Sequence, residues 1–281
     1  MSLKTVVYSS DKKTHFVSEL KNIFKDIFNS HFLAYQMAKR DIQAQYRQSF
    51  LGIFWAFAPV IINSLVWLFL NGSGVVAVQG VNIPYPLFVI IGTTLWSVFA
   101  DTVQSPMVSV NGGRGIMSKI NFPKEALLMA GMYKIFFNLA LKLGLLVVFL
   151  IYFGVNPGIN LLYFPLYLVI IMFFSFSLGL LITPIGLIYT DIAKIINTGI
   201  SFLMYLTPVV YAMPKGGFFA LLFKFNPLTY IINDARNSIT NQPIESLPLN
   251  LIFLFFSLII LMIGLVIFRK SMPIIIEKIS G

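Results

Sequence analysis

Long runs without charge dominate the chain and alternate with short polar segments. From Gln48 to Ala100, and again from Leu143 to Thr190, the sequence holds no charged residue. An apolar run of about 20 residues is long enough to cross the hydrocarbon core of a bilayer as a helix. The apolar residues are continuous rather than alternating, which favours helices over a barrel. The pattern therefore predicts an all-α polytopic membrane protein.

Six segments have the length and composition of membrane spans. They are Phe50–Leu70, Tyr85–Val108, Leu127–Phe153, Leu161–Ile188, Ile195–Tyr211 and Leu247–Phe268. We expect these spans to form one transmembrane domain, 50–268. A polar N-terminal segment, 1–49, precedes this domain, and a short tail, 269–281, follows it.

The N-terminal segment has apolar residues at helical spacing. Leu20, Ile23, Phe24, Ile27 and Phe28 follow the i, i+3, i+4, i+7, i+8 pattern, and cations such as Lys21, Lys25, Lys39, Arg40 and Arg47 lie among or after them. A basic amphipathic helix directly before a span is typical of a segment that lies along the lipid headgroups. Such an interface helix can be a surface anchor only or can also make a functional contact, and the pattern leaves both open.

Two apolar stretches between the last two spans are too short to cross a bilayer. They are GGFFALLF and FNPLTYIIN, and Asn226-Pro227 breaks the helical pattern between them. Apolar stretches of about 10–14 residues are typical of re-entrant or interfacial helices. We therefore expect a short re-entrant helical hairpin at about 215–240.

The distribution of positive charge predicts the orientation. The chain has 20 Lys and Arg against 10 Asp and Glu, a net charge of +10. Fifteen of the 20 cations fall in segments that share one side in a six-span topology, namely 1–49, 109–126, 189–194 and 269–281. Cytoplasmic segments of membrane proteins carry this excess. Both termini are therefore expected in the cytoplasm, and the basic balance does not indicate a nucleic-acid partner.

Motifs for catalysis and for metal binding are missing from the sequence. The chain has no Cys, and its two His, His15 and His31, have no carboxylate cluster beside them. The GGRG stretch at 112–115 lacks the spacing and the following Gly-Lys-Ser/Thr of a phosphate loop. No nucleophile motif occurs either. The sequence thus indicates a transporter or channel subunit without a metal, not an enzyme.

Four stretches in a fixed order resemble one family. They are AKRDIQAQYRQSFLGIFWAFAPV at 38–60, SKINFPKEAL at 118–127, TDIAKIINTGISFLMYLTPVVY at 190–211 and FNPLTYIINDARNSI at 225–239. With the six spans, they are similar to the membrane subunit of type-2 ATP-binding-cassette exporters. Within that family the chain resembles the polysaccharide-export branch, the Wzm-type O-antigen and teichoic-acid permeases. The resemblance covers roughly residues 20 to 270.

The resemblance implies a homodimer in the bacterial inner or cytoplasmic membrane. Each copy would pair with a separate cytoplasmic ATPase, which would bind ATP and Mg²⁺, and this chain would carry no cofactor. The two copies would export a lipid-linked polysaccharide through a channel between them. The resemblance also assigns Arg40, Tyr46 and Arg47 to the interface helix. A permease for a smaller lipid or a drug, and an ATPase-independent scaffold or channel, stay open as alternatives.

In this family the cytoplasmic loop after the second span carries a short coupling helix that docks on the ATPase. The resemblance places it between Ile116 and Phe122, with Ile120 as a further apolar contact and Lys119 as a flanking cation. The glycines before it are expected to turn the chain out of the span, and Pro123 to end the helix. The alternative is a positively charged loop that only sets topology.

Ionisable residues within the spans are the other candidate site. Asp101 and Lys134 each lie about 10 Å from the inner end of their predicted span, so they are expected to pair. Lys142 has no acid at matching depth in this map and is expected to face water, a polar channel or the anionic head of the substrate. The alternative is that Lys134, Asn138 and Lys142, which share a helix face, together meet sugar hydroxyls or a lipid diphosphate.

A channel for sugars needs aromatic faces that stack on the rings. The resemblance points to the first and fifth spans as channel walls. The aromatic residues expected there are Phe54, Trp55, Phe57, Phe202 and Tyr205.

Overall fold

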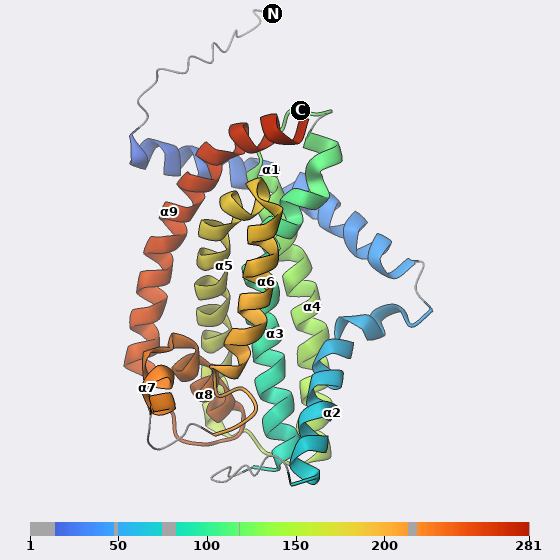
Figure 1. Ribbon diagram of the computed structural model, residues 1–281, viewed down its shortest axis with the longest axis vertical. Helices are drawn as coiled ribbons and strands as arrows, with labels where there is room; N and C mark the ends of the chain where they lie inside the picture. The colour runs from blue at the N-terminus through green and yellow to red at the C-terminus, as the bar shows by residue number, and fades with distance from the viewer. Residues whose placement is uncertain (1–14, 48–49, 75–82, 118, 213–217, 281) are drawn as a thin grey trace, which may run out of the picture.

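The computed structural model describes residues 15–47, 50–74, 83–117, 119–212 and 218–280 (Figure 1). Within those ranges every regular element is a helix. The expected all-α class is therefore confirmed.

Four helices are long and apolar enough to cross a membrane. They are α3 (Tyr85–Met117), α4 (Glu125–Tyr152), α5 (Phe164–Ile188), which the 3-10 turn η2 (Ile159–Tyr163) precedes, and α9 (Leu247–Ser280). At about 1.5 Å per residue, each exceeds the roughly 30 Å of a hydrocarbon core. They correspond to the second, third, fourth and sixth predicted spans.

The first predicted span, Phe50–Leu70, is divided. A 3-10 helix, η1 (Gly52–Ala56), comes first, and the α-helix α2 (Ala58–Gly72) follows with 15 residues. Pro59 in the first turn of α2 begins the helix, because a proline there has no N–H to leave unpaired. The resulting helix is only about 22 Å long.

The fifth predicted span, Ile195–Tyr211, is also shorter than expected. The helix α6 (Thr190–Tyr205) has 16 residues and ends shortly before Pro208, which cannot donate to a helical hydrogen bond. Its length is about 24 Å. Within the described residues, the structure thus supports four of the six predicted spans, and the count of six is not confirmed.

The helix α3 lies at the centre of the bundle. It contacts α2, α4, α5, α6 and α8, and buried residues occur on all sides of it between Leu87 and Val110. A helix that is buried all round needs apolar residues all round, which is why its sequence shows no amphipathic pattern. The helix α5 packs between α3 and α9.

The bundle has two distinct ends (Figure 1). The helix α1 (Phe16–Arg47) lies across one end, where α9 also ends, and we call this the α1 end. The short helices α7 (Phe218–Phe225) and α8 (Pro227–Ile239) lie near the opposite end, the α8 end. They are separate helices with a break at Asn226, as expected, whereas their re-entry into the membrane stays a prediction.

The helix α1 packs one side against the bundle. Ile23, Ala34 and Ala38 are buried there, against the core that α4 and α9 share. Phe24 and Phe28, which belong to the predicted apolar pattern, point away from the protein and are exposed. The position of α1 along the headgroups stays a prediction.

Buried Asp234 joins α8 to α5 and α9. Its carboxylate accepts hydrogen bonds from the Tyr167 hydroxyl at 3.3 Å, the Asn250 amide at 2.9 Å and the Ser246 backbone N–H at 3.0 Å. The Glu245 backbone N–H donates a longer one at 3.4 Å. Four donors on one carboxylate fix the position of α8.

Buried Arg236 joins α8 to α3 and to the segment after α6. Its guanidinium donates to the carbonyl oxygens of Pro208 at 3.2 Å and of Val209 at 2.6 Å. It also lies over the Phe88 ring, 3.6 Å from the ring centroid. Arg236 therefore satisfies two backbone carbonyls of the segment that follows α6.

Candidate functional site

The segment between α3 and α4 is a loop. The helix α3 continues through the glycines to Met117, and residues 119–124 have no helix. A Cβ on Gly113 would lie 2.5 Å from Leu127 Cδ2, so this glycine allows α3 to approach α4 closely. The helix predicted from Ile116 to Phe122, the turn at the glycines and the helix end at Pro123 are therefore wrong.

The residues predicted to couple to an ATPase have different environments. Ile120 is 61% exposed, and Lys119 is exposed beside it. Ile116 is half-buried in the core at the α1 end. Phe122 is buried, and the Lys124 ammonium lies 4.4 Å from its ring centroid. Ile120 is thus the apolar residue of the loop that a partner can contact, whereas Phe122 holds the loop in place.

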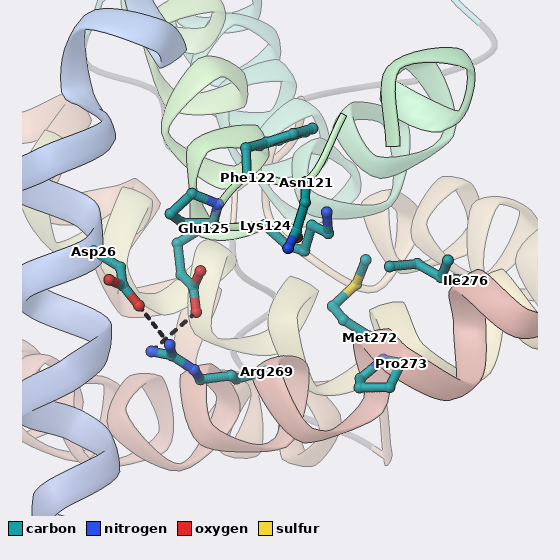
Figure 2. Close-up of a pocket in the computed structure, with 10 residues that line it drawn as sticks. Asp26, Asn121, Phe122, Lys124, Glu125, Arg269, Met272, Pro273 and Ile276 are labelled. Atoms are coloured by element: carbon teal, nitrogen blue, oxygen red, sulfur yellow. Dashed lines mark hydrogen bonds and ion pairs between the residues drawn. The ribbon is translucent and has the colours of Figure 1, made fainter. Parts of the chain in front are cut away.

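Arg269 of α9 faces three carboxylates at the α1 end, and Figure 2 shows two of them, Asp26 and Glu125. Its guanidinium pairs with Asp26, with Glu125 at 3.5 Å and with Glu19 at 3.8 Å. Glu125 is buried, whereas Arg269 remains 31% exposed. One guanidinium therefore connects α1, the start of α4 and the last part of α9.

A pocket of about 500 Å³ opens beside Arg269 (Figure 2). Its walls come from α1, from the loop and the start of α4, and from the last turns of α9. The lining residues are Asp26, Asn121, Phe122, Pro123, Lys124, Glu125, Arg269, Met272, Pro273 and Ile276. Burial lowers the pKa of the Lys124 ammonium. The pocket, the loop and Arg269 form one surface, which is the candidate docking site for a partner protein.

The predicted pair of Asp101 and Lys134 is not present. Asp101 instead accepts a hydrogen bond from the buried Lys142 ammonium at 2.5 Å. Lys134 pairs with Asp41 of α1 at 3.0 Å. The expectation that Lys142 lacks an acid at its depth is therefore also wrong.

The true lengths of the helices explain both corrections. The helix α3 extends to Met117, so Asp101 lies about 24 Å from that end. Measured from Glu125, Lys142 lies about 26 Å along α4 and Lys134 only about 14 Å. Asp101 and Lys142 are therefore level in the antiparallel helix pair.

The residues assigned to the interface helix lie in the last turns of α1. Arg40 is exposed and pairs with Asp41 at 2.6 Å. The Tyr46 hydroxyl donates to Asn138 at 3.4 Å, and Arg47 ends the helix. Burial raises the pKa of the Asp41 carboxyl, but hydrogen bonds and charges from Arg40 and Lys134 outweigh that effect and lower it overall. The end of α1 is thus held against α4 by charge.

The aromatic residues predicted to line a channel form two groups. Phe54 contacts both Trp55 and Phe57 in η1 and just after it. Phe202 and Tyr205 are exposed on α6, and the Tyr205 ring lies 6.4 Å from Trp67 of α2. The structure places α2 and α6 near each other through this contact. A role of these residues in a channel stays a prediction.

A family profile described as "ABC-2 type transporter" matches residues 33–240, from α1 to just beyond α8. The chain belongs to the ABC-2 type transporter family. Members of this family are transport subunits in a membrane, and they work with an ABC ATPase. With several helices long enough to span, this ABC-2 transporter chain is a multi-pass protein of the inner membrane.

Curated relatives narrow the comparison within the ABC-2 family. The chain is 24% identical over 239 residues to an "O-antigen export system permease protein RfbA" of Klebsiella pneumoniae. The aligned residues cover 83% of this chain and 90% of the relative. A protein of the same description from Myxococcus xanthus is 25% identical over 192 residues, 68% of this chain and 72% of the relative.

Several residues of the ABC-2 chain's site were not predicted from the sequence. Asp26, Glu125 and Arg269 carry no shared motif, and Arg269 is 243 residues from Asp26. Asp41 was visible in the Arg-Asp pattern of the N-terminal stretch, but its partner Lys134 is 93 residues away. Contacts of this kind depend on helix packing, and a single sequence gives no signal for them.

Replacing Lys142 by methionine is expected to destabilise the protein, because the partly exposed Asp101 then loses its countercharge within a candidate span. Adding Asp101→Asn to this variant should restore most of the lost stability. Thermal unfolding in detergent of the unsubstituted protein, the two single variants and the double variant should give a coupling energy of about 1–3 kcal/mol between Lys142 and Asp101. Lys134→Met combined with Asp101→Asn is the control and should be additive. An additive result for the Lys142 pair would contradict the assignment.

Proposed function

We propose that this chain is the membrane subunit of an ATP-driven exporter for a lipid-linked polysaccharide of the O-antigen or teichoic-acid type. The observation that carries the proposal is the similarity to O-antigen export permeases over 83% of the chain. Membership of the ABC-2 family supports a transport subunit rather than an enzyme. The substrate and the outward direction are the proposed part.

The α1 end faces the cytoplasm in this proposal. Fifteen of the 20 Lys and Arg fall in segments that the positive-inside rule would place there. The helix α1, the 119–124 loop and the end of α9 all lie at this end, which supports a common cytoplasmic face (Figure 1). The exposed Phe24 and Phe28 of α1 would then contact the headgroup region.

A homodimer would form the channel in this proposal. The helix α2 exposes Ile62, Leu65 and Phe69, and the neighbouring α6 exposes Phe202 and Tyr205. Both helices are shorter than a bilayer core, so a second copy that covers them would reduce their contact with lipid. The aromatic side chains would provide stacking faces for sugar rings between the two copies.

The ATPase would dock on the loop and the pocket beside Arg269. Ile120 is exposed on a loop that carries cations, and the adjacent pocket of about 500 Å³ can accept side chains of a partner. ATP and Mg²⁺ would bind to that partner, and this chain would transmit the motion through α3 and α4.

Ile120→Asp is the experiment that tests the proposal. Because Ile120 is exposed, the variant should fold and insert normally, but a charge in an apolar contact should weaken ATPase co-purification at least tenfold. In cells that need this chain to export their surface glycan, the amount of surface glycan should fall together with ATPase co-purification. Phe122→Asp is unsuitable, because Phe122 is buried and the change would disturb the fold.

Ile274→Asp is the matched control. Ile274 is also an isoleucine at the α1 end with 61% exposure, but it lies on α9 and does not line the pocket. It should leave co-purification and export unchanged. Normal co-purification and export with Ile120→Asp would exclude this docking site. Surface glycan that does not depend on the chain at all would exclude the proposed substrate.

A further inference from the structure

A second pocket lies between α3 and α4, inside two candidate spans and separate from the docking site. It has a volume of about 210 Å³, and Gln45 of α1 closes one side of it. Its polar lining consists of Gln45, Asp101, Gln104, Ser105, Ser109 and Asn138, with Lys134 beside them. Such a concentration of polar groups within spans is costly unless it has a partner or a function.

Several of these groups have hydrogen-bonding capacity that the described part of the chain does not use. The Ser109 hydroxyl is buried and has no partner there. The side-chain amides of Gln45 and Gln104 make no hydrogen bond to any described residue. Asn138 accepts from Tyr46 at 3.4 Å, and its own N–H groups stay available. Lipid hydrocarbon cannot satisfy such groups, so a polar ligand or water must occupy the pocket.

A glycine keeps this pocket open. A Cβ on Gly131 would lie 2.4 Å from Ser109 Oγ and 2.5 Å from Ser105 Oγ. Any larger residue would therefore push against the two hydroxyls that line the pocket.

The charges beside the pocket distinguish between possible ligands. Lys134 is paired with Asp41 at 3.0 Å, and Lys142 is paired with Asp101 at 2.5 Å. A phosphate or diphosphate needs cations that are free to bind it. The available groups are amides and hydroxyls, which both donate and accept, and a carboxylate oxygen, which accepts. This mixture suits the hydroxyls of an uncharged sugar, each of which also donates and accepts.

We propose that the pocket between α3 and α4 binds one uncharged sugar ring of the transported glycan. The proposal depends on the proposed function only for the glycan, since the pocket itself is a property of this chain. Gln45, Gln104, Ser109 and Asn138 would bind ring hydroxyls. The aromatic ring of Tyr46, which is hydrogen-bonded to Asn138, lies next to this polar set.

A cysteine reporter tests the proposal, because the chain has no cysteine. Val108 lines the pocket, is exposed and has no polar side-chain atom, so Val108→Cys reports on the pocket without removing a ligand. The purified full chain is labelled with a water-soluble thiosulfonate. Glucose, galactose, mannose or N-acetylglucosamine is added at about 100 mM, with sorbitol as the osmotic control. At least one sugar should slow labelling about tenfold if its Kd is about 10 mM.

Variants of the lining separate binding from a general effect. Gly131→Ala and Gln104→Leu should abolish the protection by sugar, whereas Gln43→Leu, an exposed glutamine of α1 outside the pocket, should preserve it. A cysteine at exposed Ser201 of α6 should be labelled at the same rate with or without sugar.

Three results would overturn the proposal. Unchanged labelling with all four sugars would mean a pocket that holds water only. Protection by inorganic pyrophosphate but by no sugar would mean an anion site. A lack of labelling at Val108→Cys and at a second reporter, Gln45→Cys, would mean a pocket closed to water.

Failure of the wider function gives a different pattern. Ile120 lies on the loop after α3 and does not line the pocket, so Ile120→Asp should lose the ATPase but keep protection by sugar. Protection by sugar without any ATPase-dependent export would support the sugar site and contradict the proposed exporter function. Normal export with Gly131→Ala, together with no protection by sugar in Val108→Cys alone, would support the exporter and contradict the sugar site.

Discussion

Arg269→Gln is expected to lower the unfolding midpoint of the purified protein by about 5 °C. The substitution removes the countercharge of Glu19, Asp26 and Glu125, and Glu125 is buried. Removal of one partner from a buried ion pair costs about 3–5 kcal/mol. Because Arg269 is 31% exposed, we reduce this to about 2 kcal/mol, at about 2–4 °C for each kcal/mol in a chain of this size.

The double variant Arg269→Gln with Glu125→Gln distinguishes a charge effect from lost packing. It should recover about half of the loss, since the buried carboxylate is then neutral. Lys194→Gln is the control, because its pair with Asp191 is 3.8 Å long and fully at the surface. Its midpoint should not change. Equal midpoints for Arg269→Gln and Lys194→Gln, measured by thermal unfolding in detergent, would show that Arg269 does not stabilise this end.

Asp234→Ala is expected to have an effect at least as large at the α8 end. The carboxylate accepts from Tyr167, Asn250 and two backbone N–H groups. Each buried donor left without an acceptor costs about 1–3 kcal/mol. We therefore expect a loss of about 3–5 kcal/mol, seen as a midpoint at least about 6 °C lower.

A graded series checks this assignment. Asp234→Asn keeps one acceptor oxygen and should lose less than the alanine variant, and Tyr167→Phe, which removes one donor, should lose least. Asp191→Ala, at an exposed position of α6, should have no effect. A loss for Asp191→Ala as large as that for Asp234→Ala would mean that the network around Asp234 is not what stabilises α8.

The long spans could be predicted from the sequence, because continuous apolar runs determine them independently of their neighbours. The exact helix ends could not. Gly113 indicated a turn, but in the structure it serves a close contact with Leu127, and α3 continues to Met117. A glycine has the same local signal in both roles, and only the neighbouring helix decides between them.

The error in the helix ends also changed the predicted site. The depth of Asp101 was measured from a span end that the structure moves to Met117, so the wrong lysine was matched to it. The segment between α3 and α4 that was assigned to docking is a loop, and Ile120 is exposed there, whereas its contact with an ATPase stays a prediction. The other residues of the candidate docking site, above all Arg269, come from other helices and were not predicted.

The contact between α1 and α9 also has a consequence for synthesis of the protein. Asp26 is made early, and Arg269 follows 243 residues later. At about 5–20 residues per second, the ribosome needs roughly 12–50 s for that interval. During this time α1 can already be held through Lys134, which comes earlier. A chain that stops before Arg269 would keep an uncompensated carboxylate at Glu125, and this would distinguish incomplete chains from finished ones for cellular proteases.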